Sequence, residues 1–204
     1  MTTNANLAEG VAASILAYWF GAPGSAEFNT ERAQWFRRDA AFDAAVRDRF
    51  LPAWEEALAN PDGWGTADDA APETACARIV LLDQFPRNMF RGDPRSFATD
   101  AQALALAERL VARGDDLRLP TPYHRMFCYM PFEHAESRGA QQRAVELMTA
   151  LRADTEGKVD VVEWAVRHQE VIERFGRFPH RNAVVGRATT PEEQAFLQQP
   201  GSSF

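Results

Sequence analysis

Two copies of one polar motif are the strongest candidates for chemistry in this chain. Phe85-Pro86-Arg87-Asn88 recurs much later as Phe178-Pro179-His180-Arg181-Asn182, and each copy follows a run with helical periodicity. Arginine presents a planar fork of donors that fits a carboxylate or a phosphate. The two copies therefore predict two walls of one site, whose ligand is a small anionic molecule or an acidic peptide end.

A third stretch, Tyr129-Met130-Pro131-Phe132-Glu133-His134, lies between the two copies and adds a carboxylate and an imidazole. We expect the three stretches to converge, with the guanidinium groups of Arg87 and Arg181 close together. A binding module without chemistry is the first interpretation. The alternative is an enzyme in which Glu133 or His134 moves a proton while the arginines hold an anionic substrate.

Several neighbouring polar residues are further candidates for ligand contacts. Asp83 and Gln84 end an otherwise apolar run, and a buried carboxylate there needs a cationic partner. His168 lies on an apolar helical stripe, where a histidine is most often a hydrogen-bonded core residue. Glu133 and His134 are the catalytic candidates. The predicted ligand-binding residues are Asp83, Gln84, Arg87, Asn88, His134, His168, Arg174, Arg177, His180, Arg181 and Asn182.

The same residues also allow a purely structural interpretation. Arginine and asparagine side chains can cap the carbonyl groups at helix C-termini. An ion pair between Asp83 and an arginine can likewise hold two helix ends together. In that case the motifs lock helix hairpins in place, and Arg181→Ala would lower stability without abolishing any activity.

Several well-known kinds of site have no signature in the sequence. The four histidines include no i, i+4 pair and no His-Glu-x-x-His motif. Cys76 and Cys128 are too few and too far apart for a zinc site or a disulfide framework. No phosphate loop, dinucleotide fingerprint or Gly-x-Ser-x-Gly elbow is present, and Ser137 is only a weak candidate nucleophile. We therefore predict no metal and no cofactor.

Charge and hydropathy narrow the class of protein further. The net charge of −7 argues against nucleic-acid binding, which needs a basic surface. On an acidic protein, cations gathered in one cleft would attract a small anion. No apolar run is long enough to span a membrane, and no secretory signal is evident at the N-terminus. These features predict a cytoplasmic protein.

Helical periodicity runs through the whole chain, and no segment alternates as a strand would. A length of 204 residues suits a single domain covering residues 1–204. Residues 72–84 could be read as a buried strand in isolation, but Pro72 and Glu73 favour a helix N-terminus. We predict a short helix near Trp35 that Thr30 caps. The other predicted helices cover about 7–20, 39–60, 72–84, 99–113, 122–131, 140–153, 160–175 and 190–197.

Cap and turn signals set the ends of these predicted helices. Thr99 with Gln102, and Thr190 with Glu193, have the spacing of a capping box. Pro52 is expected to kink or split its helix, because proline removes a backbone donor. The segment 61–65 is predicted to be a turn.

Prolines recur after three of the predicted helices. Pro86, Pro131 and Pro179 are 45 and 48 residues apart. This loose period favours an all-α, irregular stack of antiparallel helix hairpins that is tetratricopeptide-like. A unique orthogonal helix bundle is the alternative.

The motifs resemble the bacterial domain-of-unknown-function family 924. The resemblance is carried by Leu81–Gly92, Tyr129–Glu136 and Arg174–Asn182, and by a tail with Gly186-Arg187 and Thr190–Leu197. It covers nearly the whole chain and implies an all-helical, tetratricopeptide-like fold. It implies no particular activity, because none is established for the family.

Overall fold

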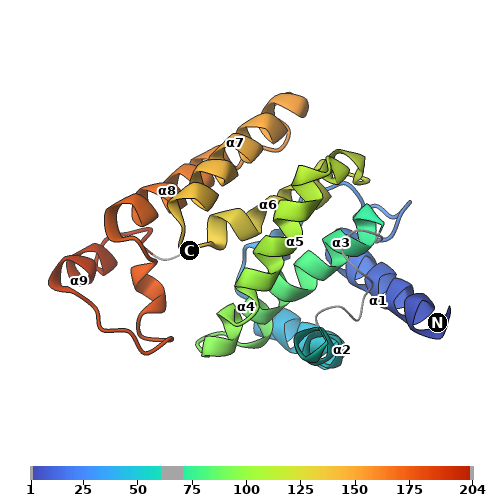
Figure 1. The fold of residues 1–204 in the computed structure, drawn as a ribbon, viewed down its shortest axis with the longest axis horizontal. Coiled ribbons are helices and arrows are strands. Elements are labelled where there is room, and N and C mark those ends of the chain that lie inside the picture. Colours follow the sequence, from blue (N-terminus) through green and yellow to red (C-terminus); the bar gives the residue numbers. More distant parts are fainter. Residues whose placement is uncertain (1, 61–70, 203–204) are drawn as a thin grey trace.

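The structure is a computed structural model that describes residues 2–60 and 71–202 (Figure 1). Within these ranges the chain forms helices and connecting segments without any strand, which confirms the predicted all-α class. None of the described helices is long and apolar enough to cross a bilayer. The predicted turn at residues 61–65 lies outside the described residues.

Most helices lie where the sequence pattern predicts them. The α-helices are α1 (Thr2–Phe20), α2 (Ala40–Ala59), α3 (Pro72–Ile79), α4 (Phe85–Met89), α5 (Asp100–Ala112), α6 (Pro122–His134), α7 (Arg138–Asp154), α8 (Val162–Phe175) and α9 (Pro191–Leu197). Short 3₁₀ turns are η1 (Ala33–Trp35), η3 (Pro94–Phe97), η4 (Asp115–Arg118) and η5 (Pro179–Arg181). A π-helical turn, η2 (Val80–Gln84), joins α3 to α4 into one continuous helical segment.

Pro86 accounts for the π-helical turn. Proline lacks the N–H that would bond to the carbonyl of Leu82, four residues back, and its ring crowds that carbonyl. The Phe85 N–H bonds to the Val80 carbonyl instead, five residues back. The hydroxyl of Thr99 then donates to the Leu82 carbonyl at 2.5 Å and replaces the missing bond.

This role of Thr99 contradicts the predicted capping box at α5. Its hydroxyl also accepts the indole N–H of Trp54 at 3.2 Å, and no side-chain bond caps the helix. Thr30 is not a cap either, because its hydroxyl bonds back to the Glu27 carbonyl and the expected helix is only the turn η1. The predicted capping box of Thr190 and Glu193 is confirmed.

Proline positions differ from the prediction as well. Pro131 lies inside α6, which continues to His134, and Pro52 lies inside α2 without ending it. Pro86 lies in the continuous helical segment. Only Pro179 comes after a helix end, which Gly176 forms with a left-handed backbone at φ 69°. The three prolines therefore do not mark equivalent turns of a repeat.

Helix packing differs between the two halves of the chain. From α5 to α8 each helix packs on the next, whereas α1 packs on α3 and α2 packs on α4. Figure 1 shows α7 and α8 reaching away from the first helices, with α9 at the far end. The first half lacks the consecutive pairing of a tetratricopeptide stack, so that detail of the prediction is not confirmed.

Two groups of apolar side chains hold these parts together. The main core is rich in aromatic rings: Trp19 is 1% exposed and its ring lies 5.5 Å from Phe85 and 5.3 Å from Phe127. A smaller core in the C-terminal part consists of Val171, Ile172 and Phe178, with Phe175 and Phe196 packed against it. The polar motifs belong to elements of both cores: Phe85 and Phe132 lie in the main core, and Phe178 lies in the smaller one.

Candidate functional site

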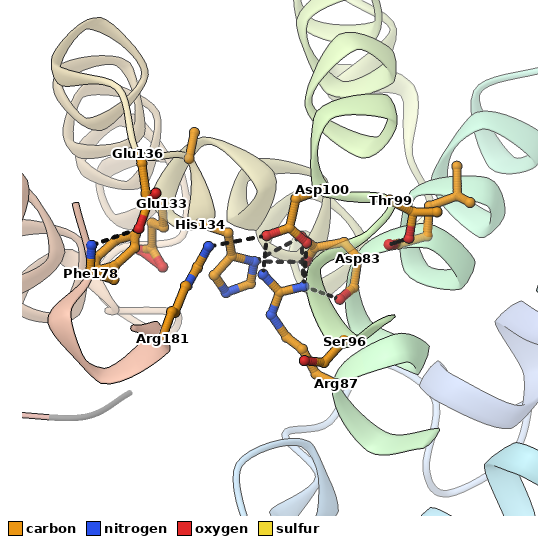
Figure 2. A network of polar contacts seen from close by, with 12 residues as sticks. Asp83, Arg87, Ser96, Thr99, Asp100, Glu133, His134, Glu136, Phe178 and Arg181 are labelled. Carbon is orange, nitrogen blue, oxygen red and sulfur yellow. Dashed lines mark hydrogen bonds and ion pairs between the residues drawn. The ribbon is translucent and has the colours of Figure 1, made fainter. Parts of the chain in front are cut away.

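The arginines of the two repeated motifs meet at a carboxylate that the sequence did not single out. Arg87, in α4, donates two parallel hydrogen bonds to Asp100, each at 2.9 Å. Arg181, in η5, donates to the same carboxylate at 3.3 Å (Figure 2). Asp100 is the first residue of α5. The guanidinium groups of Arg87 and Arg181 therefore do converge, on one side chain of the protein itself.

The third motif joins this group through a carboxylate–imidazole pair. Nδ1 of His134 lies 2.8 and 2.9 Å from the two oxygens of Asp83. The Gln84 amide donates to the same carboxylate at 2.6 Å, and Arg87 Nη1 lies 3.4 Å from it. These contacts define the Asp100 cluster, which consists of Asp83, Arg87, Asp100, His134 and Arg181.

Asp83 is ionised although it is fully buried in the π-helical turn. Burial acts to raise the pKa of Asp83, but the charge of Arg87 and the hydrogen bonds from His134 and Gln84 lower it to about 2. An ionised carboxylate can only accept hydrogen bonds. His134 therefore carries its hydrogen on Nδ1, and Nε2 is left as an acceptor.

His134 is one of three partly exposed residues of the cluster, with Arg87 and Asp100. Burial lowers the pKa of His134, the charge of Arg87 lowers it further, and the Asp83 carboxylate opposes both effects. The ring is thus neutral at neutral pH. Its side chain is 14% exposed, and its one hydrogen-bond partner among the described residues is Asp83, at Nδ1. Nε2 is therefore not committed to a bond within the described part of the chain.

Glu133 is a buried acid beside this pair. The residue is 3% exposed, and Oε1 has no hydrogen-bond partner within the described part of the chain. Burial, together with the negative charge of Asp83, raises the pKa of Glu133 to about 8. Glu133 therefore keeps its proton at neutral pH, while Asp83 is ionised. Such opposed pKa values are typical of acid–base sites.

Aromatic rings hold Arg181 in place. Its guanidinium carbon lies 4.6 Å from the centroid of the Phe97 ring and 4.5 Å from that of the Phe178 ring. Burial, and then the charge of Arg87, lower the pKa of Arg181 to about 10, so it remains a cation at neutral pH. Its Nε is buried without a partner among the described residues. Both rings are within cation–π distance of Arg181.

The two other predicted histidines flank the cluster. The ring of His168 lies 6.3 Å from that of His134, and its Nδ1 bonds to the Trp164 carbonyl at 2.8 Å. Burial lowers the pKa of His168 to about 3 and that of His180 to about 4. His168 thus has the anchored core position that a histidine on an apolar stripe suggests.

Four predicted ligand contacts lie outside the cluster. Asn88 bonds to Asp43 of α2 at 2.8 Å. The other three are Arg174, Arg177 and Asn182, which bond to Glu192 or Glu193 of α9. The repeated Arg-Asn pair thus contributes its arginines to the cluster but not its asparagines, because adjacent residues of a helical turn point about 100° apart.

Three residues that shape the site were not predicted. Asp100 and Phe97 contact both arginines of the cluster. Glu136 accepts the Phe178 N–H at 2.7 Å, which fixes the loop before Arg181. A charge argument could have indicated an acid such as Asp100, since two converging arginines need a carboxylate between them.

Two surface cavities of the described residues lie away from the cluster. Their volumes are about 260 and 370 Å³, and no residue of the cluster lines either one. The first lies between α5 and α7, and the second beside Tyr18 and Arg49. No group of three or more His, Cys, Asp or Glu side chains in the described ranges is placed to hold a metal ion.

Comparison with known proteins places the chain in a family. The family model for "Bacterial protein of unknown function (DUF924)" matches residues 15–201. A solved structure of a protein of unknown function from Agrobacterium tumefaciens is 39% identical, with a TM-score of 0.78. The similarity covers 93% of this chain and 98% of that one. No curated protein matches the chain. The chain therefore belongs to the bacterial family of unknown function DUF924.

Proposed function

We propose that the protein binds a small anionic molecule, or an acidic peptide end, at the partly exposed residues of the Asp100 cluster. The observation that carries this proposal is the state of His134. Asp83 fixes its tautomer, Nε2 has no hydrogen-bond partner among the described residues, and two arginines belong to the same cluster. This combination offers an imidazole that can take up a proton at Nε2 next to permanent cations.

A structural interpretation accounts for fewer of these features. Joining helix ends needs only the bonds from Arg87 and Arg181 to Asp100. It does not need a histidine in a fixed tautomer or a buried acid whose oxygen lacks a partner.

Contact with Nε2 of His134 predicts that the anion binds together with a proton. An ionised anion can only accept a hydrogen bond, so Nε2 must carry a hydrogen to contact it. An incoming anion favours the charged imidazole and raises the pKa of His134 above its value in the free protein. Affinity should therefore increase as the pH falls below neutrality. The charged groups that act on His134 are Arg87, Asp83 and Asp100, with His168 beside its ring.

A thermal-shift screen against anionic metabolites tests this proposal. A ligand at about 100 times its Kd adds roughly 2.7 kcal/mol to the free energy of unfolding. That should raise Tm by several degrees, at roughly 2–4 °C per kcal/mol for a chain of this size. His134→Gln should abolish the shift, whereas Arg174→Gln, which removes an exposed ion pair outside the cluster, should keep it.

Two results would contradict the binding proposal. One is a ligand shift that persists in both His134→Gln and Arg181→Ala, which would place the ligand elsewhere. The other is the absence of any hit, combined with an Arg181→Ala variant that is merely less stable. The cluster would then be a structural contact between η5, which carries Arg181, and the helices α4 and α5, which carry Arg87 and Asp100.

A second candidate function is acid–base catalysis on the bound anion. Its support is the pairing of a protonated Glu133 with a neutral His134, which can serve as acid and base at the same pH. Turnover of screening hits, followed by NMR, should fall above about pH 8 as Glu133 loses its proton. Glu133→Gln should bind the hit but not convert it. Full turnover in that variant would exclude Glu133 as the acid.

A further inference from the structure

Arg87 and Arg181 together form a cradle for a flat anion. Arg87 engages both oxygens of the Asp100 carboxylate at 2.9 Å, which is a bidentate contact in the plane of the guanidinium. Arg181 reaches one of the same oxygens at 3.3 Å, and its guanidinium carbon lies within 4.6 Å of the centroids of two aromatic rings, Phe97 and Phe178. The two arginines therefore hold one flat carboxylate between them.

Both arginines have contacts that do not depend on Asp100. Arg87 donates to the main-chain carbonyl of Asp83, and its guanidinium lies 5.7 Å from the ring of Phe97. Arg181 is fixed by the rings of Phe97 and Phe178. The cradle is thus preorganised, and preorganised donors bind a ligand at a lower entropic cost.

Asp100 is held in the cluster by the two arginines. Its carboxylate contacts only Arg87 and Arg181 among the described residues, and its side chain is 17% exposed. As the first residue of α5, it can turn outward without breaking a helical hydrogen bond. An acidic side chain at that position also remains favourable for the helix dipole when it faces solvent. Asp100 can therefore leave the cradle while the helix stays formed.

We propose that the ligand of the cluster is a carboxylate and that Asp100 is its internal competitor, which the ligand displaces from Arg87 and Arg181. This inference rests on the proposed anion-binding function and specifies its ligand class. A flat carboxylate can repeat the in-plane contacts of Asp100. A tetrahedral phosphate or sulfate carries further oxygens outside the plane that the Asp100 carboxylate occupies. A ligand bound in the cradle lies beside His134.

The internal competitor has a measurable effect on affinity. Only molecules in which Asp100 has left the cradle can accept the ligand, and the apparent affinity falls by that fraction. Acetate, as the smallest methyl carboxylate, and inorganic phosphate serve as probes at matched ionic strength. Removing the competitor in Asp100→Ser should tighten acetate binding by about tenfold or more, as measured by calorimetry. The affinity for phosphate should increase less in this variant than the affinity for acetate.

A matched control separates this effect from a general loss of negative charge. Asp43→Ser removes a carboxylate from the fork of another arginine, Arg91, outside the cluster. It should bind acetate as weakly as the wild type does. Asp100→Asn, which keeps the side-chain size, is the second variant if Asp100→Ser is too unstable, and it should show the same direction of change.

The outcomes distinguish the two levels of the proposal. Tighter phosphate than acetate binding in Asp100→Ser would overturn the carboxylate class but keep the anion site. Unchanged acetate affinity in both Asp100 variants, with hits in the wild type, would show that Asp100 is not a competitor. If neither anion binds any variant and the screen gives no hit that needs His134, both the ligand class and the proposed function fail.

In the wild type, acetate should shift the side-chain NMR signals of Arg87 and Arg181, and unshifted signals at saturating acetate would overturn the proposal.

Discussion

Glu133→Gln is expected to stabilise the protein increasingly, relative to the wild type, as the pH rises from about 4.5 to about 8. The pKa of Glu133 is raised in the folded chain, so the folded state keeps a proton that the unfolded state releases in this range. Stability therefore falls with rising pH, by about 1.4 kcal/mol per unit for one group. Glutamine has no proton to lose and removes this dependence.

The test is urea unfolding of both proteins across that pH range, with the difference in free energy of unfolding as the readout. Taking the difference removes the contributions of the buried histidines, which are common to both proteins. The total should reach several kcal/mol, because burial is nearly complete. Glu146→Gln, which changes an exposed glutamate, should give a flat difference. A flat difference for Glu133→Gln would show that the acid is ionised or solvated in the folded protein.

Asp83→Ala is expected to cause a large loss of stability, of about 3–5 kcal/mol. Asp83 is fully buried, and its removal leaves His134 and one edge of Arg87 without their carboxylate. At roughly 2–4 °C per kcal/mol, Tm should fall by about ten degrees. Thermal and urea unfolding at neutral pH measure the loss.

An exposed ion pair provides the comparison for this prediction. Asp154 bonds to Arg125 at 2.8 Å but its side chain is 52% exposed, so Asp154→Ala should cost only about 0–1 kcal/mol. Equal losses in Asp83→Ala and Asp154→Ala would mean that burial of Asp83 carries no energetic weight.

The pH dependence of Asp83 has the opposite sign to that of Glu133. The pKa of Asp83 is lowered to about 2, so its contribution is present above its unfolded pKa and is lost as the pH falls toward 2. Asp83→Asn, which keeps the side-chain shape, should therefore lack this part of the acid-induced loss. If the wild type and Asp83→Asn lose stability in parallel below about pH 4, Asp83 is not the ionised partner of His134.

The repeated Arg-Asn motif does not have one function at both of its residues. The arginines were the informative part of the pattern, since Arg87 and Arg181 reach the same carboxylate. The asparagines bond to Asp43 and to Glu193 and support the surrounding loops. A sequence repeat of this kind identifies positions on a backbone, whereas the role of each side chain depends on the direction in which it points.

The sequence alone was sufficient for the features that depend on local interactions. Helical periodicity was sufficient to predict the all-α class. The spacing of Thr190 and Glu193 was sufficient to predict their capping box, because both of its hydrogen bonds lie within one helical turn. The need of a buried carboxylate for a cationic partner predicted an arginine beside Asp83, and the structure places Arg87 there, four residues away. In each case the relevant contact lies within four residues of sequence.

Tertiary structure decided the features in which a side chain chooses a distant partner. Thr99 does not cap α5, because its hydroxyl donates to the Leu82 carbonyl, 17 residues earlier, which Pro86 leaves without a helical donor. Asp100 entered the cluster because η5 brings Arg181 to it from 81 residues away. Local spacing can specify which groups are able to bond, but burial and the approach of other elements determine which bonds form, because a buried polar group must find a partner wherever the fold supplies one.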